Sequence, residues 1–166
     1  MKRVILMRHA KSSWDNLDLS DHDRTLNDRG RKSAVMIGNW LVENNYVPDQ
    51  VICSTAVRCM ETWAGLKETM GLEIEPTFDR SLYHAHGSLL REKLTAAHAN
   101  TVLFLCHNPG VSAFAEELLE SRPKDRDLYK YPTAATTVID FDIADWSELS
   151  LRSGKLEAFI IPRRLG

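Results

Sequence analysis

The sequence predicts an α/β fold: a largely parallel β-sheet with helices on both faces, arranged as a three-layer sandwich. Apolar runs of strand length alternate along the chain with segments whose apolar residues recur at helical spacing. The run at residues 102–106 is apolar at every position, which is typical of a strand buried on both faces. The 166 residues show no repeat and no linker, so we expect a single domain over residues 1–166.

Six segments are predicted as strands because each is a short run rich in apolar, aromatic or β-branched residues. The third is expected at an edge of the sheet, and the last two are expected to close the sheet as a hairpin pair. In chain order the strands cover residues 4–7, 50–53, 73–78, 101–106, 135–141 and 155–161.

Four helices are expected between these strands. Apolar residues at 34, 37, 40 and 41 have helical spacing, and Asn27 before them is a candidate N-cap. The second helix covers 56–70 and ends at Gly71, because glycine commonly follows the last turn of a helix. The third helix covers 89–97.

The fourth helix is expected over 111–119, with Asn108 as its N-cap and Pro109 as its first residue. Proline suits that position because the first helical N–H has no partner within the helix. Two polar segments, 11–28 and 122–132, are expected as loops.

Charge and cysteine content exclude several classes of protein. The chain has 21 basic and 23 acidic residues, and this net charge of −2 argues against general nucleic-acid binding. Cys53, Cys59 and Cys106 form no zinc-type pair, and reduced thiols fit a cytoplasmic protein.

No apolar run is long enough for a signal peptide or a membrane span, so we expect no membrane association. Nothing in the sequence requires more than a monomer.

Basic side chains follow three of the predicted strands. Arg8 and His9 end the first strand, Arg58 lies one turn into the helix after the second, and His107 follows the strand at 101–106. Ligands of such sheets bind beyond the carboxyl ends of the strands. Arginine forks match phosphate oxygens, and an imidazole can act as nucleophile or base at neutral pH. Each residue alone is ordinary on a protein surface, but the four together indicate an anion site.

Three separated motifs carry a family resemblance. RHA follows the first strand, STAVRCMET the second, and LCHNPG ends the strand at 101–106. With these motifs the sequence resembles the histidine phosphatase superfamily, which includes the phosphoglycerate mutases, and within it the short SixA-like phosphohistidine phosphatases. The pattern D-x-x-R-x-L-x-x-x-G, formed by Asp21, Arg24, Leu26 and Gly30, and the segment 146–165 add to the resemblance.

The resemblance implies a role for each motif residue. His9 would be the nucleophile that becomes a phosphohistidine, Arg8 and Arg58 would bind phosphate, and His107 would bind the phosphoryl group in its transition state. Ser54 and Asn108, beside these residues in the motifs, are expected to add substrate contacts. The two arginines and the second histidine can neutralise the negative charge of the phosphoryl group during its transfer, so we expect no metal and no cofactor.

Two departures from the family pattern stand out. Ala10 replaces the usual glycine of RHG, which we expect to be tolerated if the backbone φ there is negative. No glutamate lies between Glu75 and Glu92, where mutase-like members place their general acid. Asp21 is our candidate for that acid, and a plain loop carboxylate is an equal alternative. Tyr83, His84 and His86 are weaker candidates.

Three other patterns point to different chemistry. Cys53 and Arg58 are separated by four residues, one fewer than a cysteine-phosphatase loop requires. Asp140 and Asp142 form the Asp-x-Asp pattern of haloacid-dehalogenase-type phosphatases. Only 24 residues follow Asp142, too few to hold the other motifs of that family. His84 and His86 could share a metal, although no third ligand is evident.

The leading hypothesis is a metal-independent phosphatase that acts on phosphohistidine in proteins through a phosphohistidine intermediate. A phosphatase or mutase for a small phosphorylated metabolite is the second hypothesis, although 166 residues leave little chain to roof the site. A binding module for phosphate or phosphoprotein, without turnover, is the third. The expected partner is thus a phosphorylated protein or a small phosphorylated substrate.

Overall fold

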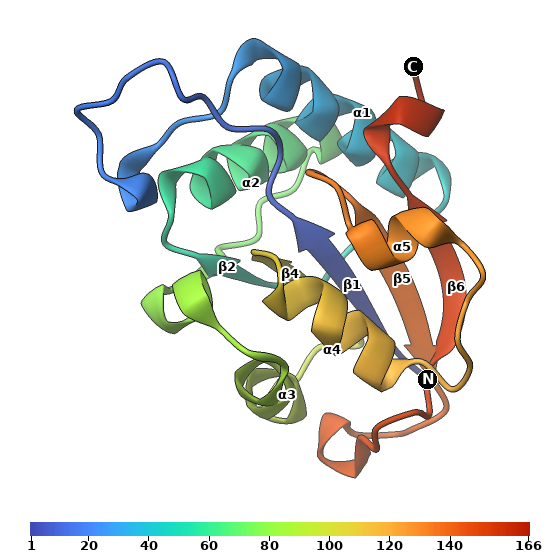
Figure 1. Ribbon diagram of the computed structural model, residues 1–166. Helices are drawn as coiled ribbons and strands as arrows, with labels where there is room; N and C mark the ends of the chain where they lie inside the picture. Colours follow the sequence, from blue (N-terminus) through green and yellow to red (C-terminus); the bar gives the residue numbers. More distant parts are fainter.

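A computed structural model describes all 166 residues, whose six strands form one mixed sheet in the order β3-β2-β4-β1-β5-β6 (Figure 1). Strands β3, β2, β4 and β1 are parallel, whereas β5 runs antiparallel to β1 and β6 antiparallel to β5. The expected closing hairpin is therefore confirmed. The strands are β1 (Lys2–Arg8), β2 (Gln50–Ser54), β3 (Thr77–Asp79), β4 (Thr101–Cys106), β5 (Thr136–Phe141) and β6 (Lys155–Ile160).

Helices cover both faces of the sheet, which confirms the three-layer α/β fold (Figure 1). Helices α1 and α2 pack on one face, and α3, α4 and α5 on the other. The helices are α1 (Asp28–Glu43), α2 (Val57–Met70), α3 (Gly87–Thr95), α4 (Gly110–Leu118) and α5 (Arg126–Lys130), with short 3-10 turns η1 (Asp21–Asp23), η2 (Arg80–His84), η3 (Trp146–Glu148) and η4 (Pro162–Arg164). None of the helices combines the length and the apolar character needed to cross a lipid bilayer.

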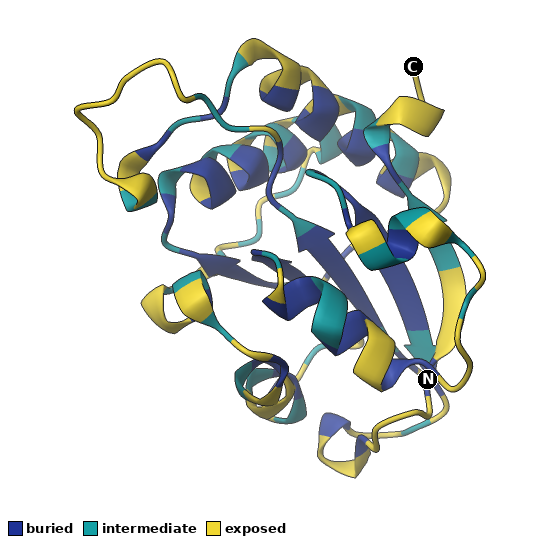
Figure 2. Ribbon diagram, in the orientation of Figure 1, coloured by how far each residue is buried: buried dark blue, intermediate teal, exposed yellow.

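The central strands β1 and β4 are buried and contribute to the cores on both faces of the sheet, and Figure 2 shows β1 buried along most of its length. Successive strand residues point to opposite faces. In β1, Val4 and Leu6 therefore join the core under α3 and α4, whereas Ile5 and Met7 join the core under α1 and α2. This double burial explains why these strands read as continuous apolar runs.

Two of the expected helix boundaries are confirmed. The Asn27 side chain accepts a hydrogen bond of 2.8 Å from the Gly30 amide at the start of α1. Gly71 ends α2 with φ +67°, a left-handed conformation that glycine adopts without strain.

Three expectations about secondary structure need correction. The expected edge strand is present at the edge of the sheet, but it covers only Thr77–Asp79 instead of 73–78, because Pro76 just before it has no N–H to donate. Asn108 does not cap α4, which begins at Gly110 with Pro109 as its N-cap residue. The segment 122–132 is not all loop, because Asp125 caps the short helix α5 by accepting from the Asp127 amide.

Candidate functional site

A cleft of about 380 Å³ opens where the carboxyl ends of β1, β4 and β2 meet. Register explains the convergence: Arg8 pairs with Cys106, so the next residues, His9 and His107, leave the sheet side by side. Their ring centroids lie 5.3 Å apart. Helices α2 and α4 also begin at this edge, and the positive ends of their dipoles favour an anion there.

The cleft collects nearly all the residues singled out in the sequence. Four basic side chains predicted to bind phosphate or react with it line the cleft together, with Asp21 and Asn108 beside them. These four are Arg8, His9, Arg58 and His107. Ser54 is the exception, because it is fully buried and does not line the cleft.

His9 is held as a neutral imidazole with one nitrogen free. Its Nδ1 lies 2.7 Å from the Ala10 carbonyl oxygen, which can only accept, so Nδ1 carries the proton. Nε2 therefore keeps its lone pair. Burial lowers the pKa of His9 to about 3, and the charges of His107, Arg58 and Arg8 act in the same direction. His9 thus has the protonation state that a nucleophile needs at neutral pH.

Ala10 fits its position in the RHA motif. It is fully buried, and its φ is not positive, so a Cβ atom causes no backbone strain. Its amide donates to Thr62 Oγ1 at 3.0 Å, and that hydroxyl in turn donates to the Arg58 carbonyl oxygen. The backbone condition on which the expected tolerance of alanine depends is therefore met.

The two arginines keep donors free for an oxyanion. Arg8 Nη1 donates to the Tyr131 carbonyl oxygen at 3.0 Å, and Arg58 Nη1 and Nη2 donate to Asp21. The Nε atoms of both arginines are buried and have no protein partner. A buried N–H without a partner costs free energy, so a bound oxyanion that accepts from these groups stabilises the site.

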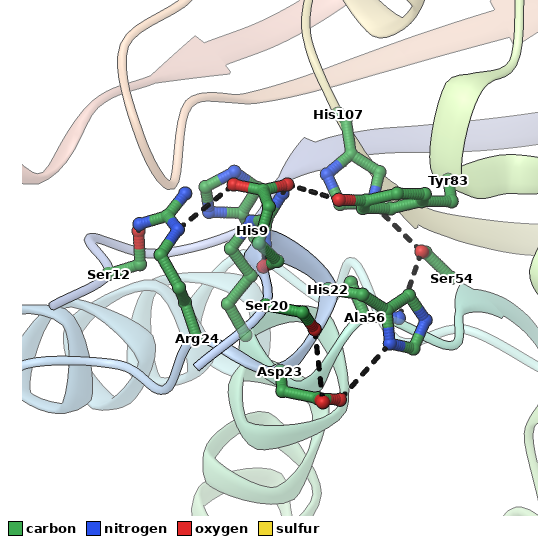
Figure 3. A network of polar contacts seen from close by, with 12 residues as sticks. His9, Ser12, Ser20, His22, Asp23, Arg24, Ser54, Ala56, Tyr83 and His107 are labelled. Atoms are coloured by element: carbon green, nitrogen blue, oxygen red, sulfur yellow. Dashed lines mark hydrogen bonds and ion pairs between the residues drawn. The ribbon is translucent and has the colours of Figure 1, made fainter. Parts of the chain in front are cut away.

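His107 is oriented by Ser54, which corrects the expectation that Ser54 contacts substrate. His107 Nε2 lies 2.8 Å from Ser54 Oγ, which itself accepts from the Ala56 amide (Figure 3). Cys59 Sγ also lies 3.5 Å from Nε2. In the tautomer in which the Ser54 hydroxyl donates to Nε2, the proton of neutral His107 lies on Nδ1. Nδ1 has no protein partner and points toward His9 in Figure 3. Burial and the charge of Arg58 lower the pKa of His107 to about 4, although Asp21 acts in the opposite direction.

Asp21 is ionised, which speaks against the general-acid role expected from the sequence. Its carboxylate accepts from the Tyr83 hydroxyl, from Arg24 Nε at 3.0 Å and from Arg58 Nη2 at 3.2 Å. The Tyr83 hydrogen bond, followed by those of the arginines, holds the pKa of Asp21 well below its usual range. Asp21 has no proton to give at neutral pH, and instead orients Arg58 and Tyr83.

Arg24 lines the cleft, although the sequence assigns it no role beyond its place in the D-x-x-R pattern. Its guanidinium lies over the Trp14 ring, 3.6 Å from the centroid, and its Nη1 donates to Ser12 Oγ at 2.5 Å. The D-x-x-R pattern was the available signal, because it places Asp21 and Arg24 in contact. Among the weaker candidates, Tyr83 and His84 line the cleft.

Gly30, the last residue of that pattern, fixes the loop after β1. A Cβ atom on Gly30 would lie 2.1 Å from the Lys11 carbonyl oxygen, so only glycine allows this approach. The same carbonyl accepts from the Asn27 amide at 3.0 Å. The start of α1 therefore holds the chain that follows His9.

Metal-ligating side chains do not gather in this structure. No group of three or more histidine, cysteine, aspartate or glutamate side chains is placed to hold one ion. His84 lines the cleft, whereas His86 does not, so the two are not joined in one site. The positive charge of the cleft comes from Arg8, Arg24, Arg58 and Lys11.

We predict that His9 and His107 make stability depend on pH. The unfolded chain binds protons on these imidazoles below about pH 6.5, whereas the folded chain does not until about pH 4 for His107 and about pH 3 for His9. The free energy of unfolding should therefore fall as pH drops from 6.5 toward 4. Urea unfolding at pH 7, 6 and 5 measures it, and a His9→Asn, His107→Asn double variant should show a shallower slope. An equal slope in the variant would contradict the assignment.

Comparison with known proteins gives concordant matches. Residues 4–82 match the family model described as the histidine phosphatase superfamily (branch 1). An uncharacterized protein of Mycobacterium leprae (strain TN) is 34% identical over 166 residues, covering 95% of this chain and 100% of that protein. Among solved structures, a candidate phosphohistidine phosphatase SixA from Agrobacterium tumefaciens is 26% identical, with TM-score 0.77 and coverage of 97% of this chain and 99% of that chain. The protein histidine phosphatase SixA in complex with tungstate shares the fold, with TM-score 0.81 at 21% identity over 99% of both chains.

Proposed function

The chain belongs to the histidine phosphatase superfamily, and from this premise we propose that it hydrolyses phosphohistidine in proteins through a covalent intermediate on His9. The observation that carries the proposal is the state of His9: a neutral imidazole with Nε2 unprotonated, between His107 and the two arginines. This arrangement combines a nucleophile with donors for the oxygens of a phosphoryl group.

The first half-reaction transfers the phosphoryl group to the enzyme. The lone pair of His9 Nε2 attacks phosphorus, and the bond from phosphorus to the leaving nitrogen breaks with its electrons going to the leaving imidazole. Free N–H groups of Arg8 and Arg58 and the Nδ1 proton of His107 donate to the phosphoryl oxygens as charge spreads over them.

The second half-reaction restores His9. A water molecule attacks phosphorus, the bond from phosphorus to Nε2 breaks with its electrons returning to Nε2, and inorganic phosphate leaves with the protons of the water shared between phosphate and solvent. The proton on His9 Nδ1 stays on that nitrogen, hydrogen-bonded to the Ala10 carbonyl oxygen, through both steps. Charge stabilisation again falls to the arginines and His107, and no metal ion enters either step.

The leaving group decides which substrate fits. An alkyl phosphate needs an acid to protonate its departing oxygen. Asp21 is ionised, and burial and the Asp21 carboxylate raise the pKa of Tyr83, so neither is suited to be that acid. A phosphohistidine leaving group can instead take a proton from solvent on its second ring nitrogen. The name phosphohistidine phosphatase of the Agrobacterium tumefaciens relative supports the same assignment.

A small phosphorylated metabolite is the second candidate substrate. One observation favours it: His84 lines the cleft, with its ring centroid 4.1 Å from that of Tyr83, where it could protonate an ester oxygen. Comparison of kcat/KM for a phosphohistidine peptide, an aryl phosphate and an alkyl phosphate at one pH separates the candidates. We expect activity to fall in that order. Faster turnover of the alkyl phosphate would establish a metabolite phosphatase, and binding without turnover of any of them would establish a binding module.

We predict that Asp21→Asn lowers kcat/KM about tenfold for phosphohistidine and aryl phosphate alike. The variant loses the charge that holds Arg58 and Tyr83, and a positioning loss affects both substrates equally. Parallel kinetics of the two substrates measure the effect. Asp23→Asn, which changes a neighbouring carboxylate outside the cleft, is the matched control. A loss confined to the ester would restore Asp21 as a general acid.

A further inference from the structure

A second pocket, of about 230 Å³, lies beside the catalytic cleft and shares two wall residues with it, Lys11 and Thr133. Its remaining walls come from the first half of α1, from the segment before β5 and from the start of η4. Figure 1 shows η4, near the C-terminus, lying against α1. Because Lys11 and Thr133 border both spaces, the two spaces are adjacent, and a ligand that spans both would pass these two residues.

The side pocket is basic. Lys11, Arg29 and Arg163 line it, and no acidic side chain does. Arg163 Nη2 is paired with Asp127 at 2.9 Å, but the side chains of Lys11 and Arg29 form neither ion pairs nor hydrogen bonds. A local excess of unpaired positive charge is unexpected in a chain whose net charge is −2.

Neutral donors accompany these cations. The hydroxyls of Ser33 and Thr133 line the side pocket and make no hydrogen bond within the protein. Cations with free hydroxyl groups are the combination that recognises carboxylate or phosphate oxygens. Arg29 can in addition offer two parallel N–H groups to such an anion.

We propose that the side pocket binds a second anionic group of the substrate, a phosphate or a carboxylate, while the first phosphoryl group lies at His9. The part of this proposal that concerns turnover rests on the proposed function, whereas the binding of a second anion does not. The side pocket would then favour substrates with two anionic groups over substrates with one.

Solvent exposure sets the expected size of the effect. Lys11 and Arg29 are exposed, so their contacts with an anion are screened by water and salt. We expect the second anion to raise affinity about three- to tenfold at low ionic strength, and the gain to shrink as salt is added.

The test is a calorimetric titration with alkane bisphosphonates that have chains of two to six carbons, and with the matching monophosphonates. The wild-type protein should bind at least one bisphosphonate about three- to tenfold more tightly than its monophosphonate. Arg29→Gln should remove most of that gain and leave monophosphonate affinity unchanged. Lys32→Gln is the matched control: Lys32 is an exposed cation on the same helix, outside the side pocket, and its loss should preserve the gain.

Two results would overturn the proposal: equal affinity for bisphosphonates and monophosphonates at every chain length, or a gain that survives in Arg29→Gln. The source of the second anion is then read from kcat/KM in Arg29→Gln. If kcat/KM falls in this variant for phosphohistidine peptides with a neighbouring glutamate, but not for peptides with alanine there, the second anion belongs to a protein substrate. If kcat/KM falls instead for a small bisphosphorylated compound, the second anion belongs to a metabolite. Failure of the proposed function would appear differently, as intact bisphosphonate binding without turnover.

Discussion

Replacement of His9 by alanine is expected to reduce turnover about 10⁴-fold or more, to near background. The variant removes the Nε2 lone pair that forms the bond to phosphorus, and the neighbouring imidazole, His107, is held through its Nε2 by Ser54. Steady-state kinetics with a phosphohistidine peptide measure the loss. Rapid quenching and detection of acid-labile phosphate on the protein should show labelling of the wild type and none of the variant.

Phosphate binding by the His9→Ala variant distinguishes a chemical role of His9 from a structural one. Because Arg8 and Arg58 remain, the His9→Ala variant should still bind inorganic phosphate within about tenfold of the wild-type affinity. His86→Ala, which changes a histidine outside the cleft, should retain wild-type turnover. Activity near wild type in His9→Ala would falsify the covalent mechanism.

Replacement of Arg58 by alanine is expected to lower kcat/KM by roughly 30- to 1000-fold, equivalent to about 2–4 kcal/mol of transition-state stabilisation. The side chain is almost fully buried at the start of α2, and its Nε, like that of Arg8, is buried without a hydrogen-bond partner in the protein. Its removal also leaves the carboxylate of Asp21 without one of its two cationic partners. Both losses act on the oxyanion contacts rather than on the nucleophile.

Lysine at position 58 provides the sharper measurement. Lysine keeps the positive charge but lacks the planar guanidinium group, whose several N–H donors can bind Asp21 and a phosphoryl oxygen at once. Arg58→Lys should therefore recover only part of the activity. Thermal unfolding of both variants checks that the fold persists. Full recovery with lysine would show that a point charge is sufficient at this position.

Most of the sheet and three of the site residues were predictable from sequence because they depend on local patterns. Double burial makes β1 and β4 continuous apolar runs, and Arg8, His9 and His107 directly follow these two strands or end them. Their proximity then follows from parallel pairing alone. The edge strand was misplaced because Pro76 decides its start, and α5 was missed because five residues are too few to show helical periodicity.

The parts that could not be predicted depend on contacts between distant segments. The ionised state of Asp21 requires the Tyr83 hydroxyl, 62 residues away in sequence. The supporting role of Ser54 requires the side chain of His107, 53 residues away. A loop carboxylate and a strand-end hydroxyl look the same in sequence whether they contact substrate or another side chain, so their roles were assigned only by the packing.

The hydrogen bond from the Ala10 amide to Thr62 Oγ1 makes that amide a reporter of the motion of His9, the proposed nucleophile. Most strand amides are protected from deuterium exchange by the sheet, and they report opening of the whole domain. The Ala10 amide is buried but is tied to a side-chain hydroxyl on α2, so it exchanges when the His9 segment separates from that helix. Its exchange rate therefore measures a local opening of the catalytic edge, independent of global unfolding. Because Thr62 also bonds to the Arg58 carbonyl oxygen, an oxyanion that bridges His9 and Arg58 should slow this exchange while leaving the amides of β5 and β6 unaffected.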